Sequence, residues 1–231
     1  SLMNILALDS CSEMCSVALY YQGQITEKKV LTERGHSELL LTMMEQVFAD
    51  SGCALSDVDA LAFGRGPGSF TGVRVGVGVA QGIAYARDIP VVPVSSLAAV
   101  AQKAGHVLGQ GYYAVAMDAR MSEIYCAHYY FDGEVASEMH AEQVCKPELM
   151  RPINGKQCYG VGSGWGVYDD VLQTQFDQQL IESNADYYPE AVSIIQLAQK
   201  AIIAGDLLPA EQALPVYLRD NVAKKKVVLN G

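Results

Sequence analysis

The sequence has few side chains of the kind that bind metals, and it lacks the spacings that metal sites use. Only four histidines occur in 231 residues, and no two of them stand four positions apart, as a pair on one helix face would. The six cysteines include no CxxC pair and no zinc-type spacing, so we expect reduced thiols. No Gly-x-Ser-x-Gly nucleophile motif is present. We therefore predict no metal ion and no catalytic residues in this chain.

Long apolar runs are also missing. The longest, residues 73–86, contains Arg74 and Gln81 and is too short to cross a bilayer. Two residues that look like an expression remnant precede Met3, and a strand-like run follows it at once, which leaves no room for a signal peptide. We expect a cytoplasmic protein with no membrane partner.

Basic side chains are in the minority. Lys and Arg number 16 against 26 Asp and Glu, for a net charge of −10. Because nucleic-acid binding depends on Lys and Arg that neutralise phosphates, we expect contact with tRNA only indirectly, through another protein. One basic run, Lys224–Lys226, lies near the C-terminus. A solvated tail is favoured there over an RNA contact.

The pattern that is present is that of an α/β protein. In the first hundred residues, apolar alternation and capping signals predict the element order βββαβα. The predicted strands are residues 4–8, 15–21, 25–31, 60–64 and 91–94, and the predicted helices run from Ser37, as the cap, to about 50, over 71–87, and from 95 or 96 to near 105.

The second half repeats this opening, with strands expected at residues 113–117, 124–131 and 135–140. At an offset of 110, Ser12-Glu13 falls on Ser122-Glu123 and Gly23 on Gly133, while Asp9 matches Asp118 after one insertion. We predict a glycine-rich loop at residues 160–166, a long helix over 190–204 and a connector after Pro209. The repeat indicates a duplicated, two-lobed α/β fold of the actin-like (ASKHA) class, with lobes at residues 3–105 and 106–231.

Two predicted helices carry more apolar surface than a helix on one sheet needs. Apolar side chains of residues 39–48 cover roughly 200° of the helix, although a stripe of ~100° or somewhat more suffices in a monomer. In residues 71–86, Arg74, Gln81 and Tyr85 form one narrow polar stripe. Glycines at 72, 76, 78 and 82 each cost about 1 kcal/mol relative to alanine, which close approach of a neighbouring element would offset.

Two explanations of these helices are open. Both are enclosed within this chain, or both form an exposed apolar surface for another protein, which we favour. The predicted partner-interface residues are Leu40, Met43, Met44, Val47, Val73, Gly76, Val77, Ala80 and Ile83.

Two segments have the composition of anion-binding loops. Asp9-Ser10 lies where a strand turns back, as in nucleotide-binding actin-like enzymes, although a simple strand-end turn is the alternative. GRGPGSFTG at residues 64–72 opens a helix, capped by Ser69 or Thr71, whose N-terminus suits an anion. It is no P-loop, and a tight turn is equally open. The candidates for a vestigial phosphate site are Asp9, Ser10, Gly66, Gly68 and Ser69.

Several motifs, in order along the first lobe, resemble the TsaB (YeaZ) family of tRNA threonylcarbamoyladenosine biosynthesis subunits. They are ILALDS at residues 5–10, CSVAL at 15–19, HSELL at 36–40 and GRGPGSFTGVR at 64–74. The second lobe matches mainly in length and strand order, with DAR at 118–120 and GVGSG at 160–164 as local echoes.

The resemblance implies membership of the complex that transfers threonylcarbamoyl to adenosine 37 of tRNAs reading codons that begin with adenine. It implies that the two apolar helices form a bundle with those of the catalytic relative, TsaD, or with a second copy of this chain. A TsaE-type ATPase would bind the assembled pair, and partner subunits would hold ATP and Mg²⁺.

The sequence departs from the catalytic relative at two points. TsaD carries an HxxxH metal pair, whereas the position four after His36 is Leu40. The second lobe is also short for one that holds an adenosine. We therefore predict an accessory, non-catalytic subunit without a cofactor of its own. The alternatives are an actin-like ATP-dependent enzyme, a metallopeptidase-like hydrolase, or a homodimeric scaffold with no TsaD role.

Overall fold

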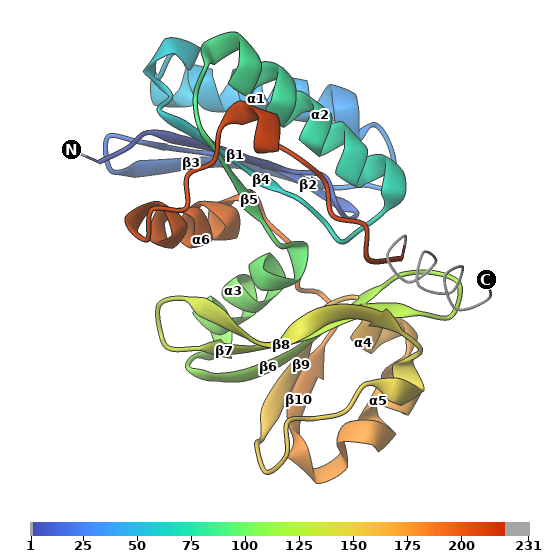
Figure 1. The fold of residues 1–231 in the computed structure, drawn as a ribbon. Helices are drawn as coiled ribbons and strands as arrows, with labels where there is room; N and C mark the ends of the chain where they lie inside the picture. Colours follow the sequence, from blue (N-terminus) through green and yellow to red (C-terminus); the bar gives the residue numbers. More distant parts are fainter. Residues whose placement is uncertain (1, 220–231) are drawn as a thin grey trace, which may run out of the picture. The chain divides into compact units, whose positions relative to one another are not determined.

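The computed structural model describes residues 2–219, which form two compact units (Figure 1). The first unit contains the residues up to Ala99 together with Tyr188–Pro215, and the second contains Val100–Tyr187 and the residues from Val216. The predicted basic tail, Lys224–Lys226, lies outside the described residues. No helix within residues 2–219 combines the length and the apolar content needed to span a bilayer.

The first unit is built on a five-stranded sheet whose order is β3-β2-β1-β4-β5. β1 pairs with β2 antiparallel and with β4 parallel. All five residues of β1 and of β4 are buried, as expected for central strands that are covered on both faces. The bounds are β1 (Ile5–Asp9), β2 (Met14–Tyr21), β3 (Gln24–Leu31), β4 (Ala60–Gly64) and β5 (Val91–Val94).

Helices cover both faces of this sheet. α1 (His36–Ser51) and α2 (Phe70–Arg87) lie side by side on one face, and α6 (Ala191–Ile203) lies on the other (Figure 1). Because side chains alternate along a strand, β1 contributes side chains to the packing on both faces of the sheet. Ile5 and Ala7 join the α6 cluster, whereas Leu8 faces Gly76 of α2.

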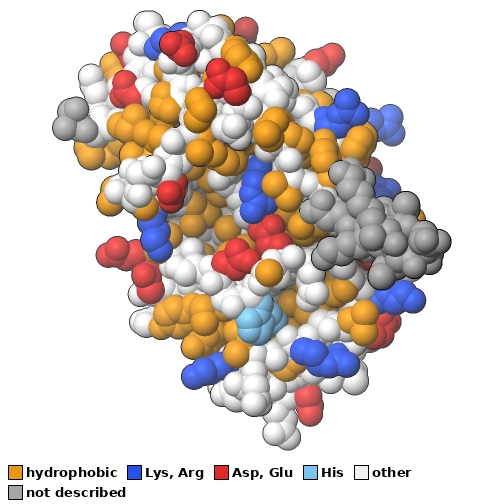
Figure 2. Space-filling model, viewed as in Figure 1, with side chains coloured by type: hydrophobic (Ala, Val, Ile, Leu, Met, Phe, Trp, Pro, Cys, Tyr) orange, Lys and Arg blue, Asp and Glu red, His pale blue; other side chains and the backbone are white. Residues whose placement is uncertain are grey.

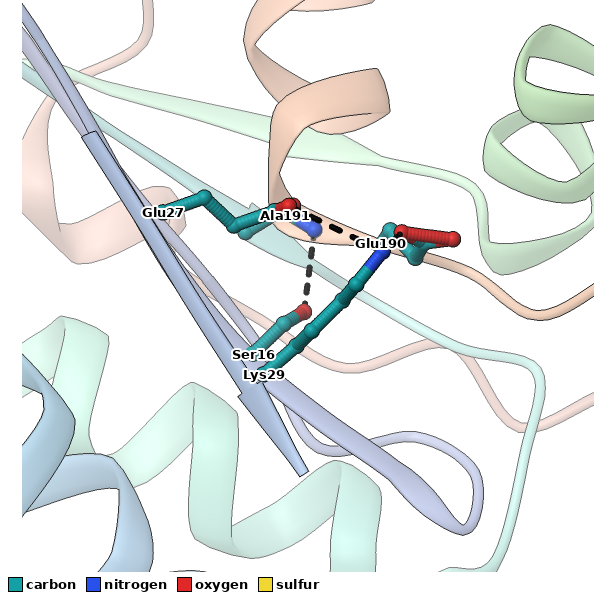
Figure 3. A network of polar contacts seen from close by, with 5 residues as sticks. All are labelled: Ser16, Glu27, Lys29, Glu190 and Ala191. Carbon is teal, nitrogen blue, oxygen red and sulfur yellow. Dashed lines mark hydrogen bonds and ion pairs between the residues drawn. The ribbon is translucent and has the colours of Figure 1, made fainter. Parts of the chain in front are cut away.

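A polar network holds the start of α6 against β2 and β3 (Figure 3). The N–H of Ala191 donates to Ser16 Oγ at 2.9 Å, so a serine on β2 caps a helix 175 residues away. Lys29 Nζ lies 2.6 Å from Glu190 Oε1, and this contact raises the pKa of Lys29. The Glu190 side chain is nearly buried while that of Lys29 is 40% exposed. The buried carboxylate is therefore neutralised by a cation that reaches in from the strand edge.

The second unit repeats the first. Its sheet order, β10-β9-β6-β7-β8, is the order of the first sheet with each strand replaced by its counterpart in the repeat. Asp9 and Asp118 close the matching strands β1 and β6. This topology confirms the predicted duplicated, two-lobed α/β fold. The bounds are β6 (Gly111–Asp118), β7 (Ile124–Phe131), β8 (Ala136–Cys145), β9 (Cys158–Val161), β10 (Leu180–Asn184), α3 (Ser96–Leu108), α4 (Gly164–Val167) and α5 (Asp169–Phe176).

The predicted boundary at residue 105 differs from the division that the structure shows. α6 follows the second sheet in the chain, yet its residues Ile194, Ile195 and Ala198 pack in the core of the first unit. α3 follows the first sheet in the chain, yet its residues from Val100 onward belong to the second unit, where Gly105 lies against the ring of Phe131. Hydrophobic periodicity shows which side of a helix is buried but not which sheet buries it.

Two local predictions are also corrected. Gly35, with φ of 80°, takes the N-cap position of α1, and no side chain caps that helix, so Ser37 is not the cap. The glycine-rich stretch at residues 160–166 is not an irregular loop, because it contains the end of β9 and all but one residue of α4. Its Trp165 is buried and donates from Nε1 to the carbonyl of Ala114 at 2.9 Å.

Candidate partner-docking surface

Most of the predicted interface residues lie inside the first unit. Met44 and Ile83 are partly exposed, but the other seven are buried. The apolar arc is wide enough to leave some apolar side chains outside, but its centre faces the sheet, because a helix on a sheet turns its most apolar side toward it. The buried residues are Leu40, Met43, Val47, Val73, Gly76, Val77 and Ala80.

An apolar strip nevertheless remains on the outer side of α1. Leu41 is 50% exposed, and Met44 and Phe48 are half-buried. These residues follow the spacing i, i+3, i+7 and therefore share one face of the helix. Figure 2 shows hydrophobic side chains that reach the surface between charged ones over the part of the molecule where α1 and α2 lie.

The outer side of α2 is unusually bare. Gly78 and Gly82 are both exposed, and a Cβ atom added at either would meet no atom within 4 Å. Nothing within this chain therefore requires glycine at these two positions. We define the outer stripe as Leu41, Met44 and Phe48 of α1 with Val75, Gly78, Val79, Gly82, Ile83 and Ala86 of α2.

The other two glycines of α2 have an internal explanation. A Cβ at Gly72 would lie 2.1 Å from the carbonyl oxygen of Ser10, and one at Gly76 would lie 2.8 Å from Ser10 Oγ. The Ser10 hydroxyl also donates to the carbonyl of Gly72 at 2.7 Å. α2 thus contains two glycines that seat it on β1 and two that leave its outer face smooth.

The edges of α2 differ from its outer face. The Gln81 amide donates to the carbonyl of Ala213 at 2.6 Å, so the segment after α6 lies along one edge. Phe70 and Tyr85 are each 59% exposed, and the guanidinium of Arg74 lies 5.0 Å from the centre of the Phe70 ring. The stripe is therefore flanked by aromatic and cationic groups, a composition typical of interface anchors.

The predicted phosphate residues do come together, but they pack on one another. The Cys11 N–H donates to Asp9 Oδ2 at 3.3 Å, while Asp9 Oδ1 has no hydrogen-bond partner among the described residues. That oxygen lies against Gly64, where a Cβ would approach it to 1.7 Å. Burial raises the pKa of Asp9 from 3.8 to about 7, against hydrogen bonds with Cys11 that lower it.

The loop that opens α2 is closed by its own contacts. Ser69 donates its N–H to the carbonyl of Cys11 at 2.9 Å, and its hydroxyl accepts from the N–H of Gly72 at 3.0 Å. Gly66 has a φ of 94° and precedes Pro67 through a cis peptide bond, and Gly68 packs on Cys11. The predicted Ser69 cap is confirmed. Since this cap occupies a helix amide and Asp9 lies beneath the loop, the geometry favours the tight-turn alternative over an anion site.

The titration of Asp9 predicts a measurable pH effect. Between pH 3.8 and about 7 the folded protein retains a proton that the unfolded chain has lost, so stability is greatest at acidic pH and falls as the pH rises. From about pH 5 to about pH 7 we expect the free energy of unfolding to fall by roughly 2 kcal/mol through this group. Asp9→Asn should remove this part of the slope. Urea denaturation of both proteins at the two pH values measures it, and parallel pH dependences would contradict the assignment.

His36, the first residue of α1, has a structural role. His36 Nε2 lies 3.0 Å from the carbonyl oxygen of Ser12, and Leu40, four positions on, is buried. Within residues 2–219, no three His, Cys, Asp or Glu side chains are grouped so as to hold a metal ion.

Relatives of this chain cover almost its whole length. It is 39% identical to the tRNA threonylcarbamoyladenosine biosynthesis protein TsaB of Haemophilus influenzae, over 97% of both chains. It is 38% identical to the TsaB of Escherichia coli, over 97% of this chain and 98% of that protein. The chain belongs to the TsaB family. This membership confirms the resemblance that the first-lobe motifs carry.

Two further comparisons agree with this assignment. YeaZ from Pseudomonas aeruginosa superposes with a TM-score of 0.88 at 40% identity, over 94% of this chain and 100% of that one. Residues 24–227 match the family described as "TsaD: tRNA N6-adenosine threonylcarbamoyltransferase". The chain is therefore related both to TsaB proteins and to the catalytic family. Of the nine residues predicted for the interface, seven are buried inside the first unit, and only Met44 and Ile83 belong to the outer stripe.

Proposed function

We propose that this chain is a non-catalytic subunit in the biosynthesis of threonylcarbamoyladenosine at position 37 of tRNA, and that it acts by pairing with a TsaD-type catalytic subunit. The names of its relatives in Haemophilus influenzae and Escherichia coli support the pathway. The match to the TsaD family supports pairing between related folds. The net charge of −10 supports a role in which partners, rather than this chain, contact the tRNA.

One observation carries the proposed pairing, namely the exposed Gly78 and Gly82 on α2. Glycine in an exposed helix costs about 1 kcal/mol relative to alanine, and here a Cβ would meet only open space. A partner helix that crosses at these positions with its backbone close to α2 explains the absence of side chains, as small residues do at other close helix contacts. Leu41, Met44 and Phe48 then supply apolar area beside the crossing.

The same stripe allows a second copy of this chain to bind when TsaD is absent, because a two-fold pair brings identical stripes together. ATP and Mg²⁺ belong to the partner subunits in this proposal. A TsaE-type ATPase would bind the assembled pair.

Reconstitution tests the proposal. Substrate tRNA is incubated with a threonylcarbamoyl donor, the TsaD-type and TsaE-type subunits of the same organism, ATP and Mg²⁺, with or without this chain. We expect modified adenosine, measured by nucleoside mass spectrometry, only when this chain is present. Equal modification without it would refute the accessory role.

Calorimetry of the chain alone with ATP and Mg²⁺ should show no binding, and micromolar binding lost in Asp9→Asn would favour the enzyme alternative instead.

A further inference from the structure

Two cysteines of the second unit lie next to each other on one face of the sheet. β7 and β8 pair antiparallel, with Cys126 opposite Gln143 and Ile124 opposite Cys145. Cys126 and Cys145 are therefore diagonal neighbours whose side chains leave the same face. Their sulfur atoms are 3.8 Å apart, in hydrogen-bond contact.

The two thiols differ in access. Cys126 is buried, while Cys145, at the end of β8, is partly exposed. Cys126 also lines a cavity of about 150 Å³ beneath Leu149, Met150 and Arg151. The cavity wall is partly polar, because His128, His140 and Gln143 also line it, and it is large enough for several water-sized molecules.

The pKa values of the two thiols shift in opposite directions, and the more exposed Cys145 has the lowered value. The hydrogen bond with Cys126 lowers the pKa of Cys145, although burial and the carboxylates of Glu123 and Glu148 oppose this effect. The same contact, together with burial, raises the pKa of Cys126. Burial raises the pKa of the other four thiols, which belong to Cys11, Cys15, Cys53 and Cys158. Cys145 is thus the one partly exposed thiol among the six, and its contact with Cys126 favours its thiolate form.

We propose that Cys145 and Cys126 form a peroxide-reactive dithiol, in which Cys145 is oxidised first and Cys126 resolves it to a disulfide between β7 and β8. An accessible thiolate beside a second thiol is the arrangement that redox-sensitive cysteines use. This modification site is independent of the docking surface, since α1 and α2 belong to the first unit.

The chemistry balances with hydrogen peroxide as the oxidant. The Cys145 thiolate attacks one peroxide oxygen, the O–O bond breaks, and hydroxide leaves, so the sulfur becomes a sulfenic acid. The Cys126 sulfur then attacks the Cys145 sulfur, an S–S bond forms, and the sulfenic oxygen leaves as water with the Cys126 proton. Two thiols are oxidised and one peroxide is reduced to two waters. Closing the bond requires the sulfurs to approach from 3.8 Å to about 2.05 Å, and the register irregularity of β8 beside Cys126 gives the strands room to adjust.

Peptide mapping of the full chain tests this proposal. The reduced protein is treated with hydrogen peroxide, unreacted thiols are alkylated, and peptides are analysed without reduction. We expect a linked Cys126–Cys145 peptide pair that is two hydrogens lighter than the free peptides and that dithiothreitol separates. Two outcomes would overturn the proposal. In one, both thiols remain free after exposed methionines have been oxidised; in the other, Cys145 becomes a sulfonic acid and no linked peptide forms.

Variants separate the two roles. In Cys126→Ser, dimedone should trap a sulfenic acid at Cys145, because no resolving thiol remains. Cys145→Ser should reduce the rate of thiol loss at residue 126 by roughly tenfold or more, whereas Cys158→Ser, at another buried thiol of the same unit, should form the disulfide at the wild-type rate. Equal oxidation of Cys126 in the presence and absence of Cys145 would contradict the order of steps. The wild-type mapping remains decisive even if a serine variant folds poorly.

Discussion

Replacing Gly78 or Gly82 with leucine should abolish pairing with the TsaD-type subunit while the free chain stays folded. Both positions face outward from α2 with open space around them, so leucine, a good helix former, adds no clash within the chain. In the complex, a leucine side chain would separate two helices whose backbones approach closely. We expect affinity to fall by about 100-fold or more, on the order of 3 kcal/mol. Titration by calorimetry and light scattering of the mixed subunits measure the loss.

The matched control is Ala204→Leu, which adds the same side chain at an exposed position just after α6 in the same unit. It should pair like the wild-type protein. Wild-type affinity in both glycine variants, with circular dichroism unchanged, would show that the outer stripe is not the docking surface. Gly76 and Ala80 are unsuitable for this test because both are buried, so bulky residues there would disturb the first unit itself.

Changing Gly72 to alanine should severely destabilise the first unit, although alanine is the better helix former. The new Cβ would lie 2.1 Å from the carbonyl oxygen of Ser10 and 2.6 Å from Ser69 Oγ. The first of these is a backbone atom just beyond β1, so relief requires α2 to lift from the sheet and to break the bond between Ser10 Oγ and the Gly72 carbonyl. We expect a loss of about 3 kcal/mol or more, measured by urea denaturation.

Gly78→Ala is the matched comparison, because it makes the same change on the same helix where nothing opposes the new methyl group. It should raise the free energy of unfolding by about 1 kcal/mol. Opposite changes in the free energy of unfolding at two positions six residues apart would confirm that the glycines of α2 serve two different purposes. A similar small gain from both variants would contradict the seating of Gly72 on Ser10.

The strands and helices of the first unit could be predicted because each has a local signal. β4 at Ala60–Gly64 and β5 at Val91–Val94 have the predicted bounds, since one short apolar run ends at Gly64 and the other begins after Pro90. No element was predicted where α5 and β10 lie, and β9 and α4 were missed because Gly160, Gly162 and Gly164 suggest a loop. The structure shows why two of these are glycines, since a Cβ at Gly160 would strike the Trp165 ring and one at Gly164 would crowd Ala116. Such packing depends on tertiary contacts that no local pattern contains.

Of the residues predicted for the candidate surface, only Met44 and Ile83 belong to the outer stripe. The wide apolar arcs pointed to α1 and α2, yet the centre of each arc faces the sheet, at Leu40, Val47 and Val77. The signal that could have found the outer stripe was the glycine pattern itself. Gly78 and Gly82 lie on a different side of the helix from Gly76 and Ala80. One pair of small residues could therefore have been assigned to the sheet and the other pair to a partner helix.

The capping of α6 by Ser16 has a consequence for how the chain acquires its structure during synthesis. The face of the first sheet that carries Ile5 and Ala7 is covered by residues 191–198, which leave the ribosome after nearly the whole polypeptide has been made. Until then, that face remains open to solvent and to other nascent chains. A truncated chain that ends at residue 105 would thus lack α6 and leave one face of the first sheet uncovered. A chain in which residues 1–105 are joined to residues 188–215 would contain every element of the first unit.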